Sequence, residues 1–318
     1  MNTATQFEAW LTKTQNKSFE EKRDALDPIY TKYTTKGDTS EFDYRSVTGT
    51  TNLGPASVIT DVGDFPKVEY TPGTERVLKF KKVTIGMVVP EFLEEDMRNN
   101  GRVKYEKIGF FERINQDFID SMNWTFEIIS SDFLLRGDST VATSTWPGAG
   151  RDGLALLSAS HVTAVGVPVT WSNLQAAGPL NALNLKEAVT MLENIPDERG
   201  KPQSDIKHII IECGRYYEWR LPEILKSALQ PDTANNTINS VTARGIKYTV
   251  VINPYLGIGN KRWAVINGNQ KSMLHFMKTK PSFSKATDPY TGAKIYRSVS
   301  RFAIDFDSAK DIVGNLGA

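Results

Sequence analysis

The motif Ser158-Ala-Ser160-His161 is the closest grouping of residues that could do chemistry. A serine there could act as a nucleophile, with His161 as its general base. Adjacent residues rarely face each other in the required geometry, however, and catalytic triads are assembled from distant segments. No Gly-x-Ser-x-Gly turn surrounds either serine. We therefore predict no catalytic residue and no enzyme, and keep a cytoplasmic serine hydrolase that uses Ser160 and His161 as an alternative.

Metal and cofactor sites need clusters of residues that this sequence does not show. The three histidines and the single cysteine are far apart along the chain: His161, His208, Cys213 and His275. A zinc cluster of the usual spacing is therefore not expected. The sequence also contains no phosphate-binding loop, Gly-x-Gly-x-x-Gly or His-Glu-x-x-His motif. We expect neither a cofactor nor a bound metal.

Two groups of acidic residues could bind a cation or exchange protons. Glu94-Glu95-Asp96 falls in the opening turn of an expected helix, where the helix dipole favours acids. Asp305 and Asp307 alternate with apolar residues, so we expect them to face solvent or a neighbouring molecule. Both groups are interpreted as surface charge.

A basic cluster surrounds Phe80 and is made of Arg76, Lys79, Lys81 and Lys82. It could be a solvated end of a strand, a contact with an acidic patch on a second copy, or a nucleic-acid contact in which Phe80 stacks on a base. We favour the contact with a second copy, because of the element that carries the cluster.

That element is an expected two-stranded ribbon. Val68-Glu-Tyr70 leads through a Pro-Gly turn into Arg76 to Val89, in which Val83, Ile85 and Met87 alternate with other residues. An isolated two-stranded ribbon is marginally stable in water, and the neighbouring sequence supplies nothing to cover its apolar face. The basic cluster and Val83, Ile85 and Met87 are therefore predicted to contact another subunit.

A long helix is expected from about Lys104 to Leu135, preceded by a shorter helix at Pro90 to Asp96. Apolar residues repeat at helical spacing in two stripes. The first contains Ile108, Phe111, Phe118, Met122, Ile129 and Phe133, and the second contains Phe110, Ile114, Trp124 and Ile128. Two apolar stripes predict a helix packed between two layers.

The remaining segments predict an α+β protein, since helices and strands alternate without a regular βαβ rhythm. Polar residues 1 to 55 hold two short helices at most, around Phe7 to Lys13 and Phe19 to Tyr33. Later elements are a helix capped by Asn184, a helix at Tyr216 to Leu229, a polar loop from Gln230 to Gly245, and strands at 207–213, 247–253, 262–267, 273–279 and 302–306. The last strand is expected to be half buried.

The composition restricts the environment of the protein. Its 318 residues include 38 Lys and Arg against 37 Asp and Glu, a net charge of +1, so tight phosphate binding is not expected and DNA should be contacted weakly. No apolar run approaches the roughly 20 residues that span a bilayer. Cys213 lies in an apolar run and is predicted to be a buried, inert thiol in a reducing cytoplasm.

The order of elements and several motifs resemble the Mu-like major head subunit family, which has the Hong Kong 97-like capsid fold. The matching motifs cover nearly the whole chain: Asp152-Gly-Leu-Ala-Leu-Leu-Ser-Ala-Ser-His161, Trp171-Ser-Asn-Leu174, Leu221-Pro-Glu-Ile-Leu225, Asn235-Asn-Thr-Ile-Asn239, Asn253-Pro-Tyr-Leu256, Trp263-Ala-Val-Ile266 and Arg301-Phe-Ala-Ile-Asp-Phe306. The resemblance implies a tailed-phage capsid subunit that forms hexamers and pentamers around double-stranded DNA.

The resemblance also implies a domain assignment. Residues 1–55 would be an N-terminal arm, 56–90 an extended loop, 91–182 a peripheral domain with a spine helix, 183–290 an axial domain, and 291–318 a segment returning to the peripheral domain. Asn235, Asn236 and Asn239 in the axial loop become candidate contacts between subunits.

Some members of this family carry an N-terminal scaffolding segment, for which this chain has no room, so a separate scaffold protein is expected. Portal and decoration or head-completion proteins are further expected partners. No covalent crosslink between subunits is predicted. The expected location is the virion, after assembly in the host cytoplasm. An encapsulin-like shell that holds protein cargo is the alternative of the same fold.

Overall fold

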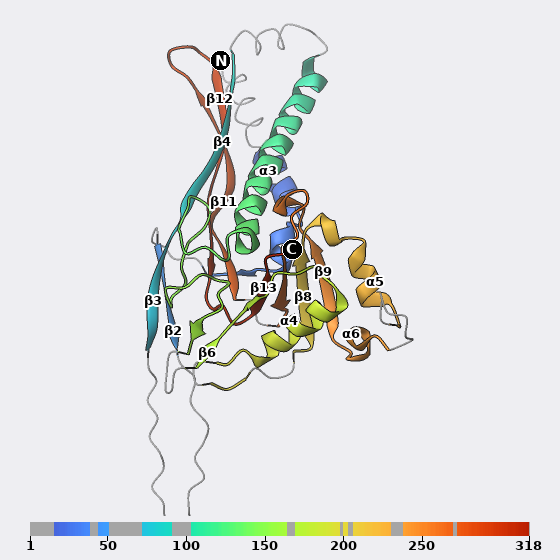
Figure 1. Ribbon diagram of the computed structural model, residues 1–318. Helices are drawn as coiled ribbons and strands as arrows, with labels where there is room; N and C mark the ends of the chain where they lie inside the picture. The colour runs from blue at the N-terminus through green and yellow to red at the C-terminus, as the bar shows by residue number, and fades with distance from the viewer. Residues whose placement is uncertain are drawn as a thin grey trace, which may run out of the picture.

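The computed structural model describes residues 16–38, 44–50, 72–90, 103–163, 169–197, 200–202, 206–229, 238–269 and 272–317. Two larger sheets and one long helix organise these residues into an elongated part and a compact part (Figure 1). The expected α+β class is confirmed. Expectations for Phe7 to Lys13, Val68 to Tyr70 and Pro90 to Asp96 concern segments that lie wholly or largely outside the described residues.

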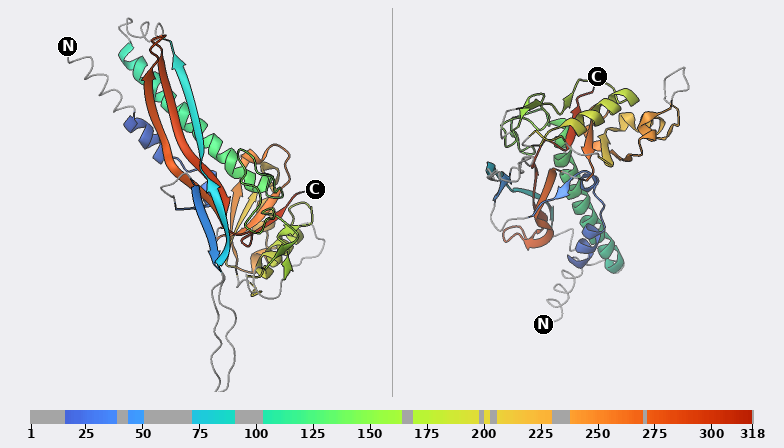
Figure 2. Two further views of the ribbon diagram at one scale, coloured as in Figure 1. Left: turned by 90° about the vertical axis from the view of Figure 1, so that its left-hand side faces the viewer. Right: turned by 90° about the horizontal axis from the view of Figure 1, so that it is seen from below.

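The elongated part is a four-stranded sheet with α3 lying along it (Figure 2). The strand order is β1-β11-β12-β4, and the elements are β1 (Thr35–Lys36), β11 (Met273–Thr287), β12 (Lys294–Phe306), β4 (Lys81–Val89) and α3 (Val103–Leu135). Helical residues 16–24 and the 3-10 helix η1 (Ile29–Lys32) pack near α3.

The compact part is a five-stranded sheet with the order β7-β13-β10-β8-β9. Its strands are β7 (Leu174–Gln175), β13 (Ile312–Asn315), β10 (Trp263–Asn267), β8 (His208–Cys213) and β9 (Lys247–Ile252). Around it lie α4 (Ala182–Asn194), η2 (Arg215–Tyr217), α5 (Arg220–Lys226), α6 (Ser240–Ala243) and η3 (Pro254–Leu256). Two small sheets pair β2 (Tyr44–Thr50) with β3 (Pro72–Lys79), and β5 (His161–Val162) with β6 (Thr170–Trp171).

Helix α3 confirms the prediction of a long helix almost to the residue. Phe118, Met122 and Phe133 of the first stripe are buried against the sheet, as the spacing predicts. The second stripe does not behave as one face, because Trp124 and Ile128 are exposed. Periodicity shows which residues share a face of a helix, but not whether a second layer covers that face. The prediction of a helix covered on both sides is therefore wrong along this part of α3.

The expected ribbon is divided at Phe80 into two strands with different partners. Strand β3 pairs with β2, whereas β4 pairs with β12 from Lys81↔Phe302 to Val89↔Lys294. Val83, Ile85 and Met87 consequently pack against the core of their own chain. The premise that these three residues lack cover within their own chain is wrong, because their partner strand lies about two hundred residues later in the sequence. Their contact with another subunit stays a prediction.

The C-terminal strands differ from the prediction in burial and in sheet membership. Strand β12 is covered on both faces near its end, so Asp305 is buried with Ala303 instead of facing solvent. Asp307 remains partly exposed and forms an ion pair with Arg151. Strand β11 joins β12 and not β9 or β10, and β13 joins the five-stranded sheet. The chain therefore passes from the five-stranded to the four-stranded sheet near residue 270 and returns to the five-stranded sheet with β13, and the expected boundary at 290 falls in the β11–β12 hairpin.

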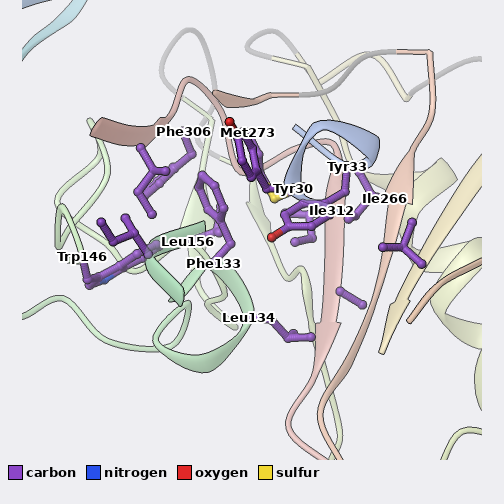
Figure 3. Close-up of a cluster of buried hydrophobic side chains, with 14 of the residues drawn as sticks. Tyr30, Tyr33, Phe133, Leu134, Trp146, Leu156, Ile266, Met273, Phe306 and Ile312 are labelled. Atoms are coloured by element: carbon purple, nitrogen blue, oxygen red, sulfur yellow. The ribbon is translucent and has the colours of Figure 1, made fainter. Parts of the chain in front are cut away.

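One apolar core connects the two parts. Tyr30, Phe133, Trp146 and Ile312 gather there from η1, α3, the following loop and β13 (Figure 3). Trp146 stacks on Phe306 with ring centroids 5.7 Å apart, and its indole nitrogen donates to the Ser139 carbonyl. Because this core includes side chains from both sheets, we expect the elongated and compact parts to fold together.

Local signals at α4 and β8 are only partly as expected. Asn181, not Asn184, caps α4, and its side-chain oxygen accepts a hydrogen bond from the Asn184 amide. Cys213 is fully buried at the end of β8, which confirms the predicted burial. Burial raises the pKa of its thiol to about 12, so the thiolate that reacts with other groups is not formed at neutral pH.

Candidate functional site

The basic cluster lies around Phe80, where β3 of the two-stranded sheet is followed by β4 of the four-stranded sheet. Lys79 and Lys82 are exposed, whereas Lys81 is partly buried and its Nζ donates to the Thr143 carbonyl at 2.9 Å. Burial lowers the pKa of Lys81, although the nearby Asp132 carboxylate opposes this shift. The side chain of Arg76 is outside the described residues. The cluster is therefore divided into a lysine used within the fold and two lysines available at the surface.

Phe80 is engaged inside the chain. Its ring packs edge-on against Phe276 at a centroid distance of 6.3 Å, and the Lys278 ammonium lies 5.7 Å from its centroid. These contacts occupy part of the ring surface on which a base would stack. The geometry therefore argues against the nucleic-acid interpretation of the cluster.

A groove of about 370 Å³ lies beside the base of the β2–β3 hairpin. Phe302 and Ile304 are among its apolar lining residues, and Lys79 and Lys81 lie along it with the loop that carries Thr143. Val77 on β3 is exposed next to it. An apolar groove with cations along it suits an amphipathic or acidic segment of another molecule.

Asn239 does not present its side chain at the surface. The side chain is fully buried, donates to the carbonyls of Ile224 and Ser227, and accepts from the Val241 amide at the start of α6. The prediction that Asn239 contacts another subunit is wrong, because this side chain closes the turn between α5 and α6. Asn235 and Asn236 lie outside the described residues.

The buried His161 pairs with the partly exposed Asp152 rather than with a serine. Its Nδ1 donates to Asp152 Oδ2 at 2.6 Å, and its ring stacks on Trp171 with centroids 4.5 Å apart. Burial alone would raise the pKa of Asp152, but the hydrogen bond from His161 and other interactions outweigh it and lower this pKa. His161 Nε2 has no hydrogen-bond partner within the described residues, and the Ser158 and Ser160 hydroxyls lie 3.5 Å from each other. The serine–histidine pair that a hydrolase needs is not formed.

Glu212 is a buried acid of the five-stranded sheet. It lies close to Glu127 of α3 and to Tyr33 of the N-terminal segment. Glu212 on β8 is fully buried, and one of its oxygens accepts from Asn253 Nδ2 at 2.8 Å. Its other oxygen has no partner in the described part of the chain, and neither does the hydroxyl of Tyr33. Burial raises the pKa of Glu212 from 4.5 to about 7, with a further contribution from Glu127. The carboxyl is therefore partly protonated near neutral pH.

Glu127 on α3 holds the start of η1. Its two carboxylate oxygens accept from the backbone amides of Ile29 and Tyr30 at 2.6 and 3.2 Å. Ser131, one turn later on α3, interacts with Asn253, which in turn donates to Glu212. This network was not predicted from the sequence. An acid inside the apolar run of β8 was the one signal that could have indicated it.

We expect Glu212→Gln to make the protein less sensitive to pH. A carboxyl whose pKa is raised on folding binds a proton more tightly in the folded state. Stability is therefore lost as pH rises from about 4.5 to about 7, and is constant above that range. The glutamine should stabilise the protein by roughly 1–3 kcal/mol at pH 8 and by little at pH 4.5.

Urea unfolding at several pH values measures this difference. Glu223→Gln, an exposed glutamate of α5, serves as the control. Equal pH dependence in the wild type and Glu212→Gln would contradict the assignment, since other buried acids, such as Asp311, are unchanged in both.

The structure is similar to solved capsids over nearly its whole length. The capsid of the cyanophage P-SCSP1u covers 92% of this chain and 88% of its own, with 9% identity and a TM-score of 0.54. The capsid of a native GTA particle covers 92% of both chains, with 8% identity and a TM-score of 0.55. The chain has the fold of these capsid subunits. The mature capsid of bacteriophage PhiM1 agrees, with 92% and 88% coverage, 9% identity and a TM-score of 0.55.

Sequence comparison does not detect this likeness. No protein-family model matches the chain, and no curated protein matches it. At 8–9% identity the likeness to these capsids is one of fold. The described helices include none long and apolar enough to cross a membrane, and the described residues form no cluster of metal-binding side chains.

Proposed function

We propose that this chain is the major capsid subunit of a tailed phage, and that hexamers and pentamers of it close into an icosahedral shell around double-stranded DNA. The capsid fold, matched over 92% of the chain and 88–92% of the solved capsid chains, is the observation that carries the proposal. The serine and histidine of the hydrolase alternative do not meet, which supports a structural role.

The arrangement of elements supports a Hong Kong 97-like subunit. The four-stranded sheet with α3 would form the peripheral domain, and the five-stranded sheet with α4, α5 and α6 the axial domain. The extended loop would begin and end with the paired strands β2 and β3, which moves its limits from 56–90 to about 44–79. Residues before the hairpin would form the N-terminal arm.

The exposed lysines at the hairpin base are proposed as contacts between subunits. Lys79 borders the apolar groove, and Lys82 lies two positions beyond Phe80. Arg76, Asn235 and Asn236 stay candidates for the same role. A separate scaffold, a portal and decoration proteins are proposed partners, and the virion is the proposed location.

Purified wild-type chain should form closed shells or capsomers visible by negative-stain electron microscopy. Lys79→Glu with Lys82→Glu should lower the yield of shells by about tenfold, equivalent to losing ~1.4 kcal/mol of contact energy. Lys207→Glu with Lys247→Glu changes the charge equally at exposed positions on the compact part and is the control.

DNA binding separates this role of the lysines from a nucleic-acid role. Labelled duplex should bind wild-type and mutant capsomers equally weakly, in the non-specific range of roughly 10⁻⁴ to 10⁻⁶ M. A monodisperse monomer at all concentrations would contradict the proposed function. Tight duplex binding lost in the Lys79/Lys82 variant would assign these lysines to DNA. Particles purified from their native source with protein cargo in place of DNA would favour the encapsulin-like alternative.

A further inference from the structure

Two aromatic side chains project from the compact part next to α5. Trp219 is 84% exposed and Tyr216 is 56% exposed, although both belong to a well-packed segment after β8. The buried Tyr217 anchors this segment, and its ring packs edge-on against Tyr216 with centroids 4.9 Å apart. Exposed tryptophan and tyrosine on a rigid support are typical of residues that dominate protein interfaces.

An open groove of about 650 Å³ lies on the same part of the protein, between the segment after β6 and α4. Trp171 forms one wall, and Thr190, Met191 and Ile195 contribute from α4 and its end. Stacking on the buried His161 holds Trp171 in place. The volume falls within the roughly 300–1,000 Å³ of sites that enclose large side chains or small ligands.

The aromatic projection and the groove lie toward opposite edges of the five-stranded sheet. Strand β7, which follows Trp171, forms one edge of the sheet, and β8, which leads to Trp219, lies near the other edge. Figure 1 places α5 and β6 on opposite sides of α4. The two surfaces cannot meet within one chain. Between copies they would form a head-to-tail contact, which closes into a ring when the rotation allows.

The charges beside these surfaces are complementary. Lys186 lines the groove and Glu218 precedes Trp219, and neither side chain has an ion pair within the described residues. Two further charges near these surfaces have partners within the chain. Arg220 pairs with Glu223 at 2.9 Å, and Gln175 Nε2 donates to Glu187 at 3.3 Å. A second copy can therefore bring an unpaired anion to an unpaired cation.

We propose that Trp219 of one copy enters the groove between Trp171 and α4 of the next copy, with Glu218 facing Lys186 across the contact. This inference rests on the proposed function. It names one interface that joins neighbouring copies of the chain into the ring of a capsomer. The contact joins two different surfaces of the chain, so it serves rings of five and of six with small changes in angle.

Paired cysteines test the contact directly. Glu218→Cys with Lys186→Cys, treated with a short bismaleimide, should give a ladder of covalent species ending at the pentamer and hexamer. Trp219 is retained in this variant, and the native Cys213 is buried. Glu218→Cys with Tyr290→Cys, at the exposed β11–β12 turn, is the mismatched control and should give no ladder.

Charge reversal and truncation provide a second readout in the full chain. Glu218→Lys and Lys186→Glu should each reduce capsomer yield, and their combination should restore it. Trp219→Ala should weaken capsomer formation by roughly thirtyfold, as for a central interface residue. Shells that form normally from Trp219→Ala, with no ladder from the cysteine pair, would overturn this inference and leave the proposed function intact. A wild-type chain that never assembles would overturn both.

Discussion

Phe118→Asp should abolish the production of soluble, folded protein, whereas Trp124→Asp on the same helix should be tolerated. Phe118 is 5% exposed and its ring lies 6.1 Å from that of Phe283, in a cluster that joins α3 to the elongated sheet. A buried, unpaired carboxylate there costs several kcal/mol, against a total stability of about 5–15 kcal/mol for a typical domain. Trp124 is 58% exposed, so an aspartate at that position keeps its hydration.

The soluble fraction after expression and the thermal midpoint of both variants measure this difference. Comparing them on one helix separates loss of core packing from loss of helix propensity, since aspartate is the new residue in both. A soluble Phe118→Asp protein with the midpoint of the wild type would show that this face of α3 is not packed against the sheet.

The elements that the sequence predicts well are those with a long or dense local pattern. Helix α3 has a repeated apolar spacing over more than thirty residues, and its predicted ends agree with Val103–Leu135 to within one residue. Strand β8 is a short apolar run that contains a single acid, Glu212, and it is predicted to within one residue too. In both cases the buried face is encoded by neighbouring residues, so no knowledge of distant partners is needed.

Predictions that depended on distant partners failed. Val83, Ile85 and Met87 show correct strand alternation, but the cover for their face is supplied by β12 and α3. Asn239 belongs to a polar segment typical of an exposed loop, yet its three hydrogen bonds close a turn inside the chain. Composition separates polar from apolar residues, whereas tertiary contacts decide which polar residues become buried.

Some candidate interface residues can be identified from the local sequence, whereas others can be identified only from the folded structure. The exposed lysines Lys79 and Lys82 are identifiable from the sequence as a charge cluster, and the structure leaves them at the surface. Trp219 was not identified, because a tryptophan near Pro222 in a short helix is usually part of a core. Only its exposure in the folded chain separates it from Trp146 or Trp263, which are fully buried.

Removing residues 51–71 should prevent closed shells while leaving the subunit folded. These residues connect β2 to β3, which pair from Tyr44↔Lys79 to Thr50↔Pro72. An Asn-Gly turn can join Thr50 to Pro72 directly, since a two-residue turn of this type suits antiparallel strands. About ten residues on each side of the connection can extend ~35 Å from the hairpin, far enough to reach an adjacent subunit. The shortened chain lacks that reach, so capsomers or shells should be reduced to background.

The folded state of the shortened chain is the necessary comparison. The apolar cores are formed by other residues, so its thermal midpoint should stay close to that of the wild type. A second variant, in which residues 51–71 are replaced by a Gly/Ser segment of equal length, separates reach from side-chain contacts. Failure of both variants to close shells assigns the contact to the side chains of 51–71. Closure by the Gly/Ser variant alone assigns it to length, and normal shells from the shortened chain would contradict a role of this loop between subunits.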